Sequence, residues 1–259
     1  MISDFTRKSS HLNLRHSKIE SDRFGLGVDR INVSNDCPAT DNEIVEICAE
    51  SKSDLLILRY PSNRTQMSQS LSQMRSRNAF HADTLVYFSK KLEELGEQHN
   101  PKDNWKFLIA KSNDESRIID LARLVFRDYP NHYRSNRNLD SELILDGYLE
   151  WASIGLKDPN KLTAIIENNC LTAIAFALVA FDDDGAEIEL NGVHPDFQNQ
   201  GVYSALLESL MMQLASQKVE KLSISTQIQN TKVIKAWIKA GFTLDFSLNT
   251  FHLVSRQSV

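Results

Sequence analysis

The stretch Val193-His-Pro-Asp-Phe-Gln-Asn-Gln-Gly-Val-Tyr203 decides the fold of this chain. A strand with alternating apolar residues, 187–193, runs into it, and an amphipathic helix centred on Leu210 leaves it. We expect the backbone N–H groups at the start of this helix to be free and to carry a partial positive charge. A strand-to-helix junction of this kind is suited to bind a phosphate group.

Composition places the chain among ordinary globular proteins. It has 259 residues, of which 41% are hydrophobic and 24% are charged, and its net charge is -5. This apolar content is enough for a packed core, and the length predicts one or two domains. Because a nucleic-acid-binding surface needs a basic stripe, the acidic charge is evidence against a nucleic-acid partner.

Targeting and metal signals are also missing from the sequence. No segment has the ~18–20 consecutive apolar residues of a membrane span, and residues 1–20 lack the apolar centre of a secretory signal. The cysteines Cys37, Cys48 and Cys170 form no CxxC pair, and the histidines show no metal-ligand spacing. We therefore expect no disulfide framework, no metal, no membrane partner and a cytoplasmic location.

A polar stretch with Gly and Pro, residues 96–104, predicts a linker. We expect a small α/β domain over residues 1–98 and a second domain over residues 105–259. In the first domain, with Asp41 as the cap of its first helix, the pattern predicts the order strand, helix, strand, helix, strand over residues 24–33, 41–51, 55–60, 68–77 and 84–88.

The second unit has a longer pattern. The order is one strand, two helices, three strands, helix, strand, helix and two strands, over residues 105–110, 114–125, 143–151, 161–166, 171–181, 187–193, 206–214, 221–227, 231–240, 242–244 and 251–254. Gly241 is the expected left-handed end of the last helix. Residues 173–181 are almost wholly apolar, as expected for a strand covered on both faces.

This order and two motifs resemble the GNAT acetyltransferase family. The first motif is the acyl-CoA loop Gln/Arg-x-x-Gly-x-Gly/Ala, here Gln198-Asn-Gln-Gly-Val-Tyr203, and the second is Asn-x-x-Ala-x-x-x-Tyr-x-x-x-Gly-Phe, here at 230–242. The resemblance covers residues 105–259. It implies an α/β (α+β) GNAT fold, with a mixed central sheet split near its fourth and fifth strands, preceded here by the small N-terminal α/β domain.

A narrower resemblance, to the TDP-fucosamine acetyltransferase subfamily, extends into the N-terminal unit. Its segments are Asp22-Arg-Phe-Gly25, Val28-Asp-Arg-Ile31, Phe80-His-Ala-Asp-Thr-Leu-Val86, Tyr133-Arg134, Tyr148-Leu-Glu-Trp151 and Ser225-Thr-Gln-Ile-Gln-Asn-Thr231. These enzymes acetylate the 4-amino group of a TDP-linked deoxysugar. They carry a similar small α/β unit that contributes to the acceptor site.

The resemblance implies that acetyl-CoA is the cosubstrate. Its pyrophosphate would lie on the N–H groups of the acyl-CoA loop, where Gly201 lets the backbone approach closely. The alternative is an ordinary strand-to-helix turn. The cofactor-binding residues implied are Val193, Gln198, Asn199, Gln200, Gly201, Val202, Tyr203, Asn230 and Trp237.

The family opens its fourth strand with a bulge and aims one backbone N–H at the thioester oxygen. Val193 would supply this N–H, an oxyanion-type donor worth roughly 2.7–4 kcal/mol in comparable sites. The dipeptide Asn191-Gly192 suits such a bulge. The alternative is a plain strand end before Pro195.

The acceptor amine must lose a proton before it can attack. Asp83 matches an acidic residue near the substrate in the sugar-modifying subfamily, and Glu187 matches a carboxylate on the fourth strand of some GNAT enzymes; a water chain is the third possibility. Period-two alternation puts Glu187, Glu189 and Asn191 on one strand face. We expect Asn191 to contact substrate and Glu189 to be a solvated charge.

The thiolate product must gain a proton. The Tyr that the family usually offers in its second motif is Trp237 here, and an indole N–H is no practical proton donor. Water, the released ammonium proton or Tyr203 could substitute. Trp237 could equally be a core aromatic residue.

The loop at 131–137 occupies the position that most often shapes acceptor specificity in the family. Tyr133, Arg134 and Arg137 suit a nucleotide diphosphate and a stacking base, and a solvated surface loop is the alternative. Tyr148 and Trp151, three residues apart on the next helix, are expected in the core.

Together the two resemblances imply an N-acetyltransferase that uses acetyl-CoA to acetylate an amino sugar by direct attack in a ternary complex. The sugar would be a TDP-linked 4-amino-4,6-dideoxyhexose. Two alternatives stay open: a GNAT enzyme for another small amine, and a non-catalytic acyl-CoA-binding regulatory module. The family is also compatible with a homodimer.

Overall fold

The computed structural model describes residues 12–92 and 105–256. Ten strands join in one mixed sheet in the order β1-β2-β3-β10-β4-β9-β8-β7-β6-β5. They are β1 (Leu12–His16), β2 (Val28–Val33), β3 (Leu55–Pro61), β4 (Arg77–Lys91), β5 (Trp105–Ile109), β6 (Lys161–Asn168), β7 (Ala173–Asp182), β8 (Gly185–Val193), β9 (Lys221–Gln227) and β10 (Thr243–Ser255).

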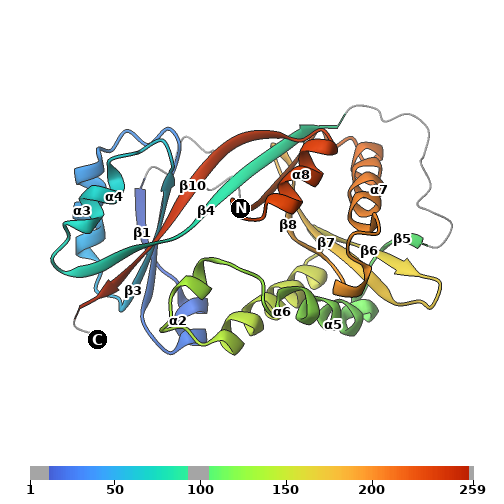
Figure 1. Ribbon diagram of the computed structural model, residues 1–259, viewed down its shortest axis with the longest axis horizontal. Helices are drawn as coiled ribbons and strands as arrows, with labels where there is room; N and C mark the ends of the chain where they lie inside the picture. The colour runs from blue at the N-terminus through green and yellow to red at the C-terminus, as the bar shows by residue number, and fades with distance from the viewer. Residues whose placement is uncertain (1–11, 93–104, 257–259) are drawn as a thin grey trace.

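Helices cover both faces of this sheet (Figure 1). The α-helices are α2 (Lys18–Phe24), α3 (Asp41–Glu50), α4 (Met67–Ser72), α5 (Glu115–Phe126), α6 (Ser141–Lys157), α7 (Val202–Ser216) and α8 (Thr231–Lys239). Short 3-10 helices are η1 (Ser112–Asp114), η2 (His132–Ser135) and η3 (Pro195–Phe197). The predicted linker at 96–104 lies outside the described residues.

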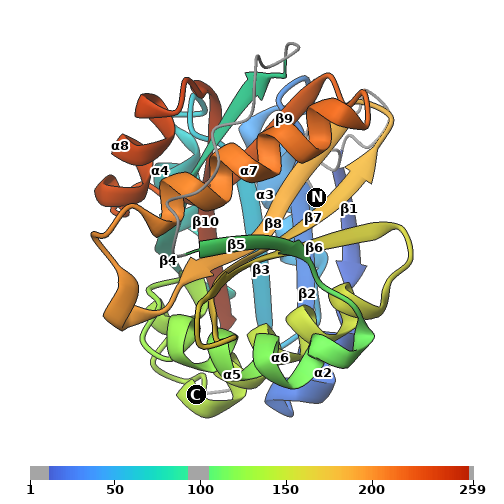
Figure 2. The ribbon, with the colours of Figure 1, turned by 90° about the vertical axis from the view of Figure 1, so that its right-hand side faces the viewer.

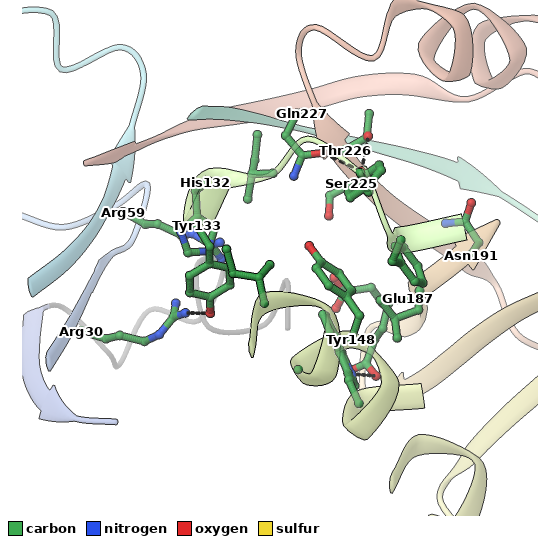
Figure 3. Close-up of a pocket in the computed structure, with 18 of the residues that line it drawn as sticks. Arg30, Arg59, His132, Tyr133, Tyr148, Glu187, Asn191, Ser225, Thr226 and Gln227 are labelled. Atoms are coloured by element: carbon green, nitrogen blue, oxygen red, sulfur yellow. Dashed lines mark hydrogen bonds between the residues drawn. The ribbon is translucent and has the colours of Figure 1, made fainter. Parts of the chain in front are cut away.

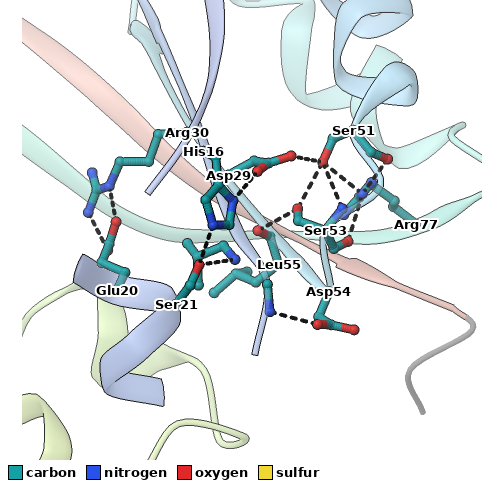
Figure 4. Close-up of polar contacts among 12 residues, drawn as sticks. His16, Glu20, Ser21, Asp29, Arg30, Ser51, Ser53, Asp54, Leu55 and Arg77 are labelled. Carbon is teal, nitrogen blue, oxygen red and sulfur yellow. Dashed lines mark hydrogen bonds and ion pairs between the residues drawn. The ribbon is translucent and has the colours of Figure 1, made fainter. Parts of the chain in front are cut away.

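Two long strands, β4 and β10, run through the middle of the molecule (Figure 1). β10 lies between β3 and β4 and is antiparallel to both, and β4 then pairs with β9. The buried Arg77 at the start of β4 donates to the carbonyl oxygen of Leu253 (2.9 Å) and, as Figure 4 shows, to that of Ser51 (2.8 Å). The sheet therefore contains strands from both segments, 1–98 and 105–259.

Side chains of β7 fill a core on each face. Ala175, Ala177 and Val179 pack in the cluster under α7 and α8, whereas Phe176 and Leu178 pack under α5 and α6. Figure 2 shows these helices on either side of the strands. The apolar run is thus covered on both faces from 173 to 180, as predicted, whereas Phe181 at its end is exposed. A third core lies between α3, α4 and the strands β2, β3 and β10.

The sheet is split between β8 and β9. These strands run parallel and pair only from Ala186 to Ile188 on β8 and from Leu222 to Ile224 on β9. Both strands continue beyond this pairing, to Val193 and Gln227. The predicted split in a mixed sheet is confirmed.

Several predicted element boundaries were wrong. The two C-terminal strands are one strand, β10, with an irregularity at Asp245, because backbone bonds to β3 and β4 hold its polar middle. For the same reason β4 begins at Arg77, and α4 ends at Ser72 rather than at Arg77. Pairing with a neighbour on each side, which local periodicity does not encode, sets these lengths.

The N-terminal segment differs from its prediction as well. α2 includes Phe24, the first residue of the predicted strand at 24–33. It is capped by Gly25, which has a φ of 65°, and is preceded by β1. Thr40, not Asp41, caps α3, because its side chain accepts from the Glu43 backbone N–H and Glu43 bonds back to Thr40. The left-handed Gly241 was correctly predicted, with a φ of 87°.

Candidate active site

A bulge in β8 shapes the split. The pairing of β7 with β8 shifts between Leu178–Leu190 and Val179–Ile188, so Glu189 is the extra residue. The bulge was predicted two residues later, at Asn191-Gly192. Its position reverses the side-chain alternation, because Leu190 now packs under α5 and α6.

The alternation expected for β8 is therefore wrong at its end. Asn191 lies opposite Ala177, whose side chain belongs to the core under α7, and so points to the other face from Leu190. Glu187 and Asn191 are on opposite faces of the strand. Both nevertheless border the same cavity, since the strand ends beside the split.

The backbone of Val193 faces the gap between β8 and β9. His194 donates its N–H to the carbonyl of Ile174 (2.8 Å), which makes these two residues a bonded antiparallel pair. Neighbouring residues in such a ladder point their N–H groups in the opposite direction. The N–H groups of Val193 and Asn191 thus point away from β7, toward the gap where β9 no longer pairs.

The loop after β8 leads into α7 through two left-handed residues. Asn199 has a φ of 62° and Gly201 a φ of 93°, and α7 starts directly afterwards, with no acidic side chain in its first turn. A Cβ at Gly201 would find its nearest atom, on Trp105, only at 4.0 Å, so the space above the loop is open. Lys232 lies beside it, with Nζ 3.5 Å from Gln198 Oε1. This geometry fits a phosphate group.

Tyr203, in the first turn of α7, is held by Trp237. The indole N–H of Trp237 donates to the Tyr203 hydroxyl at 2.7 Å. Trp237 is fully buried and packs edge-on against Phe88, so it is a core residue as well as a hydrogen-bond donor. Burial raises the pKa of Tyr203, so the phenol keeps its proton at neutral pH.

A cavity of about 320 Å³ lies on the sheet face opposite α7. It lies among the strands β2, β3, β4, β8 and β9, the helices α2, α5 and α6, and η2 (Figure 3). Aromatic rings make up much of its wall: Phe24, Tyr87, Phe126, Tyr129, Tyr133, Tyr148 and Trp151.

Comparison with known proteins agrees with this geometry. The model of the Acetyltransferase (GNAT) family matches residues 118–242, which include the split, the loop and α8. Residues 118–242 therefore belong to a GNAT acetyltransferase domain. That family uses acetyl-CoA as acetyl donor.

Individual relatives are distant. The spore coat polysaccharide biosynthesis protein SpsD of Bacillus subtilis (strain 168) is 24% identical over 140 residues, which cover 54% of this chain and 47% of SpsD. The chain thus spans about half the length of that curated relative.

Among solved structures, two are similar over nearly the whole chain. A functionally unknown conserved protein from Staphylococcus epidermidis ATCC 12228 has a TM-score of 0.61 at 12% identity and covers 96% of this chain and 92% of its own. A GCN5-related N-acetyltransferase from Sphaerobacter thermophilus also has a TM-score of 0.61 at 12% identity, over 93% and 75% of the two chains. At this identity the likeness concerns the fold alone.

At one end of the cavity, the GNAT domain gathers polar groups beside the split. Glu187, Asn191 and Ser225 line it there (Figure 3). The Tyr129 hydroxyl donates to Gln227 Oε1 at 2.5 Å, and burial raises the pKa of that hydroxyl. Sequence reasoning missed Tyr129; its only signal was a tyrosine just before the predicted loop at 130–140.

Asn230, the first residue of the second GNAT motif, directly precedes α8, and its side chain does not cap the helix. Its Nδ2 donates to Thr226 Oγ1 at 3.1 Å. Asn230 therefore sits at the end of β9, next to a residue that lines the cavity.

The other end of the cavity is built from the N-terminal segment. Arg30 donates through Nη2 to Glu20 (2.6 Å) and to the Tyr133 hydroxyl (2.8 Å), and Tyr133 also donates to Glu20. Burial alone would raise the pKa of Glu20, but Arg30 outweighs it and lowers this pKa to about 2. Arg59 lines the same end. The available signal was a charge inside the apolar strand 55–60.

The predicted substrate residues are only partly brought together. Tyr133 lines the cavity, whereas Arg134 donates to the carbonyl of Arg127 and Arg137 is exposed outside the cavity. Tyr148 and Trp151, expected in the core, line the cavity instead, and Trp151 is 41% exposed. The core expectation for Trp151 was wrong, because α6 turns this face toward the cavity rather than toward β7.

The carboxylates also lie in different surroundings. Glu187 lines the cavity, but Asp83 on β4 does not; Asp83 is 4% exposed, and neither carboxylate oxygen has a hydrogen-bond partner among the described residues. Glu189 is not a solvated charge. It forms a buried ion pair with Lys161 at 2.5 Å, because the bulge turns it toward β6.

Within residues 12–92 and 105–256, no three His, Cys, Asp or Glu side chains are grouped so that they could hold a metal ion. Nor does any helix in this described part have the length and apolar character that crossing a membrane requires.

Proposed function

We propose that this protein is an acetyl-CoA-dependent N-acetyltransferase that acetylates the amino group of an amino sugar in a ternary complex. The observation that carries the proposal is the gap at Val193. An unpaired backbone N–H points into it, the phosphate-suited loop lies on one side of the sheet, and the polar cavity lies on the other. Donor and acceptor can therefore meet at that N–H.

The residues that would hold acetyl-CoA come from β8, the loop and α8. The N–H groups from Asn199 to Tyr203 suit its pyrophosphate, and Lys232 adds a positive charge beside Gln198. When bound, acetyl-CoA supplies an activated acetyl thioester. Val193 N–H would then stabilise negative charge that develops on a carbonyl oxygen in the gap.

Two side chains are placed to move protons. Glu187 lines the cavity beside the split, and we assign it the role of general base, acting directly or through one water. The other carboxylate of the lining, Glu189, is held by Lys161. Tyr203 accepts a hydrogen bond from Trp237, so its own O–H stays available to donate toward the leaving group. Trp237 would thus act by orienting Tyr203.

The acceptor would be a nucleotide-linked amino sugar, such as a TDP-linked 4-amino-4,6-dideoxyhexose. Three features support this: the aromatic wall, the arginines at the far end, and the part that segment 1–98 takes in forming the acceptor site ahead of the acetyltransferase domain at 105–259. The name of the relative SpsD, a polysaccharide biosynthesis protein, points weakly in the same direction.

The test is release of free CoA from acetyl-CoA across a panel of amine acceptors. The panel contains nucleotide-linked 4-amino sugars, the same sugars without nucleotide, polyamines and aminoglycosides. We expect the highest kcat/KM with a nucleotide-linked sugar. A clear preference for a polyamine or an aminoglycoside would refute the sugar assignment, and binding of acetyl-CoA without turnover on any acceptor would favour a regulatory module.

A further inference from the structure

Arg59 is the cation of the cavity that the protein itself does not neutralise. Arg30 is paired with Glu20, and Arg23, at the rim, is paired with Glu150 at 2.6 Å. Arg59 makes no ion pair with a carboxylate of the described residues, and its Nε is buried without a hydrogen-bond partner. Arg59 as a whole is half-buried, and a buried N–H such as its Nε–H is normally hydrogen-bonded, since leaving it unpaired is costly.

The sheet register keeps the unpartnered carboxylate of Asp83 away from Arg59. Arg59, Thr250 and Asp83 lie directly opposite one another on β3, β10 and β4. Asp83 is two strands away, ~9–10 Å at the usual strand spacing. Thr250 Oγ1 and both Asp83 oxygens are buried and unpartnered too. The guanidinium fork of Arg59 is therefore left for a group inside the cavity (Figure 3).

A chain of hydrogen bonds fixes the tautomer of His132, which lines the cavity beside Arg59. The Asn138 N–H donates to Asn136 Oδ1 (3.1 Å), so Asn136 must turn its NH₂ group toward His252 Nδ1 (3.3 Å). His252 Nδ1 then accepts, and His252 Nε2 donates its hydrogen to His132 Nδ1 (2.9 Å). The remaining hydrogen of His132 is on Nε2.

Electrostatics keeps this relay in one state at neutral pH. Burial, aided by Arg59, holds the pKa of His132 well below its usual value, and burial lowers the pKa of His252 to about 3. Both rings are neutral near pH 7. Among the described residues no group accepts from His132 Nε2, so this N–H is a fixed, uncharged donor at the Arg59 end of the cavity.

We propose that Arg59 and the Nε2–H of His132 form a subsite for the diphosphate of the acceptor, at the end of the cavity away from Glu187. This inference rests on the proposed function and names the residues that recognise its substrate class. An arginine fork binds phosphate oxygens in pairs, and a neutral imidazole N–H adds a third donor.

The length of the cavity supports a diphosphate rather than a charged sugar alone. Arg59 on β3 and Glu187 on β8 are four strands apart in the sheet, ~19 Å between backbones at the usual strand spacing. The side chains shorten this distance, but one hexose ring does not span it. A hexose joined to a diphosphate brings its amine to Glu187 while its phosphates reach Arg59.

Calorimetric titration of thymidine diphosphate into protein saturated with CoA tests the subsite. Thymidine and glucuronate are titrated in parallel, and no step requires acetyl transfer. We expect thymidine diphosphate to bind at least 10-fold more tightly than thymidine. Arg59→Met should remove most of that difference without changing CoA affinity, whereas the exposed Arg75→Met should leave it within 2-fold.

Arg59→Lys serves as the second variant, because it keeps the charge where Arg59→Met could unfold. Arg59→Lys should lower the affinity for thymidine diphosphate by 3-fold or more, because lysine lacks the paired donors of the guanidinium group. His132→Phe should lower this affinity by a similar factor. Equal binding of thymidine and its diphosphate, or unchanged binding in Arg59→Lys and Arg59→Met, overturns the subsite, as does tighter binding of glucuronate. Intact diphosphate binding with no turnover would instead count against the proposed enzyme activity.

Discussion

The cofactor end and the acceptor end of the candidate site are built in different ways. At the cofactor end, the groups that matter are backbone N–H groups of one continuous segment, 191–203, held by a bulge, a split and a helix start. At the acceptor end, they are side chains from β2, β3, η2 and β10, brought together only by the folded sheet.

This difference decides how each end tolerates change. Backbone donors are removed only by a change of backbone conformation or by a side chain that blocks the space above them. We therefore expect substitution of Gly201 to impair acetyl-CoA binding, and substitution of most neighbouring residues to have little effect on it. The acceptor end depends on individual side chains such as Arg59, and a single substitution can alter its specificity while the domain stays folded. We expect substitutions at the cofactor end to change the rate with every acceptor, and substitutions at the acceptor end to change which acceptor is preferred.

The largest effect is expected at the cofactor end, from Gly201→Glu. The new carboxylate would lie where the phosphates of acetyl-CoA are expected, and the φ of 93° disfavours any side chain. Binding of acetyl-CoA should become undetectable by calorimetry. Gly201→Ala is the matched control, since it introduces the strain without the charge and should lose about 10-fold. Equal losses in the two variants would mean that strain, not phosphate binding, explains the sensitivity.

Next in size is the loss expected from Glu187→Gln, where the two ends meet. If Glu187 is the general base, kcat should fall by roughly 10²- to 10⁴-fold at neutral pH. The loss should shrink at high pH, where the amine is already deprotonated. Asp83→Asn is the companion variant, because Asp83 is buried on the same sheet but does not line the cavity. A pH-dependent loss in Asp83→Asn alone would transfer the role to Asp83.

The strand and the helix at the cofactor end were predicted from the sequence for a physical reason. A glycine followed by an amphipathic helix and preceded by an apolar strand is a local pattern, whereas the split was implied by the resemblance to the GNAT family. The bulge was misplaced by two residues, because either end of 189–192 can accommodate it and only pairing with β7 selects Glu189.

The acceptor end was largely missed. Tyr133 was predicted, but Arg59, His132 and Tyr129 were not, since their neighbourhood depends on β10 entering between β3 and β4 from the far end of the chain. The arginines of the loop at 131–137 looked equally suitable in sequence, yet Arg134 bonds to a backbone carbonyl and Arg137 is exposed. Local spacing does not reveal which cations face a cavity formed by distant strands.

The acceptor end also predicts how stability depends on pH. His132 and His252 have lowered pKa values in the folded protein, and about 6.5 is usual in an unfolded chain. As pH falls below 6.5, the unfolded chain binds protons that the folded protein does not, so the free energy of unfolding decreases. The slope approaches about 1.4 kcal/mol per pH unit for each histidine. Glu20, with a pKa of about 2, acts in the same direction only below pH 4.5.

Urea unfolding between pH 7.5 and pH 5 measures this slope. His252→Gln removes one of the two titrations and should flatten the curve, even if the variant is less stable at every pH. A slope unchanged from the parent protein would mean that the buried pair does not govern acid sensitivity. The acceptor end would then be no more sensitive to acid than the rest of the sheet.

The smallest effect concerns a side chain at the cofactor end, Tyr203→Phe. Removing the hydroxyl leaves the buried Trp237 N–H without its acceptor, which should lower the free energy of unfolding by about 1–3 kcal/mol in urea titrations. If Tyr203 also donates a proton to the leaving group, kcat should fall while the affinity for acetyl-CoA stays the same. Trp237→Phe keeps the hydroxyl but no longer orients it, so its kcat should fall less. Since both variants break the same bond, the double variant should lose less stability than the two single losses added together. Additive losses would show that Trp237 and Tyr203 act independently, and that this end of the site is formed by backbone alone.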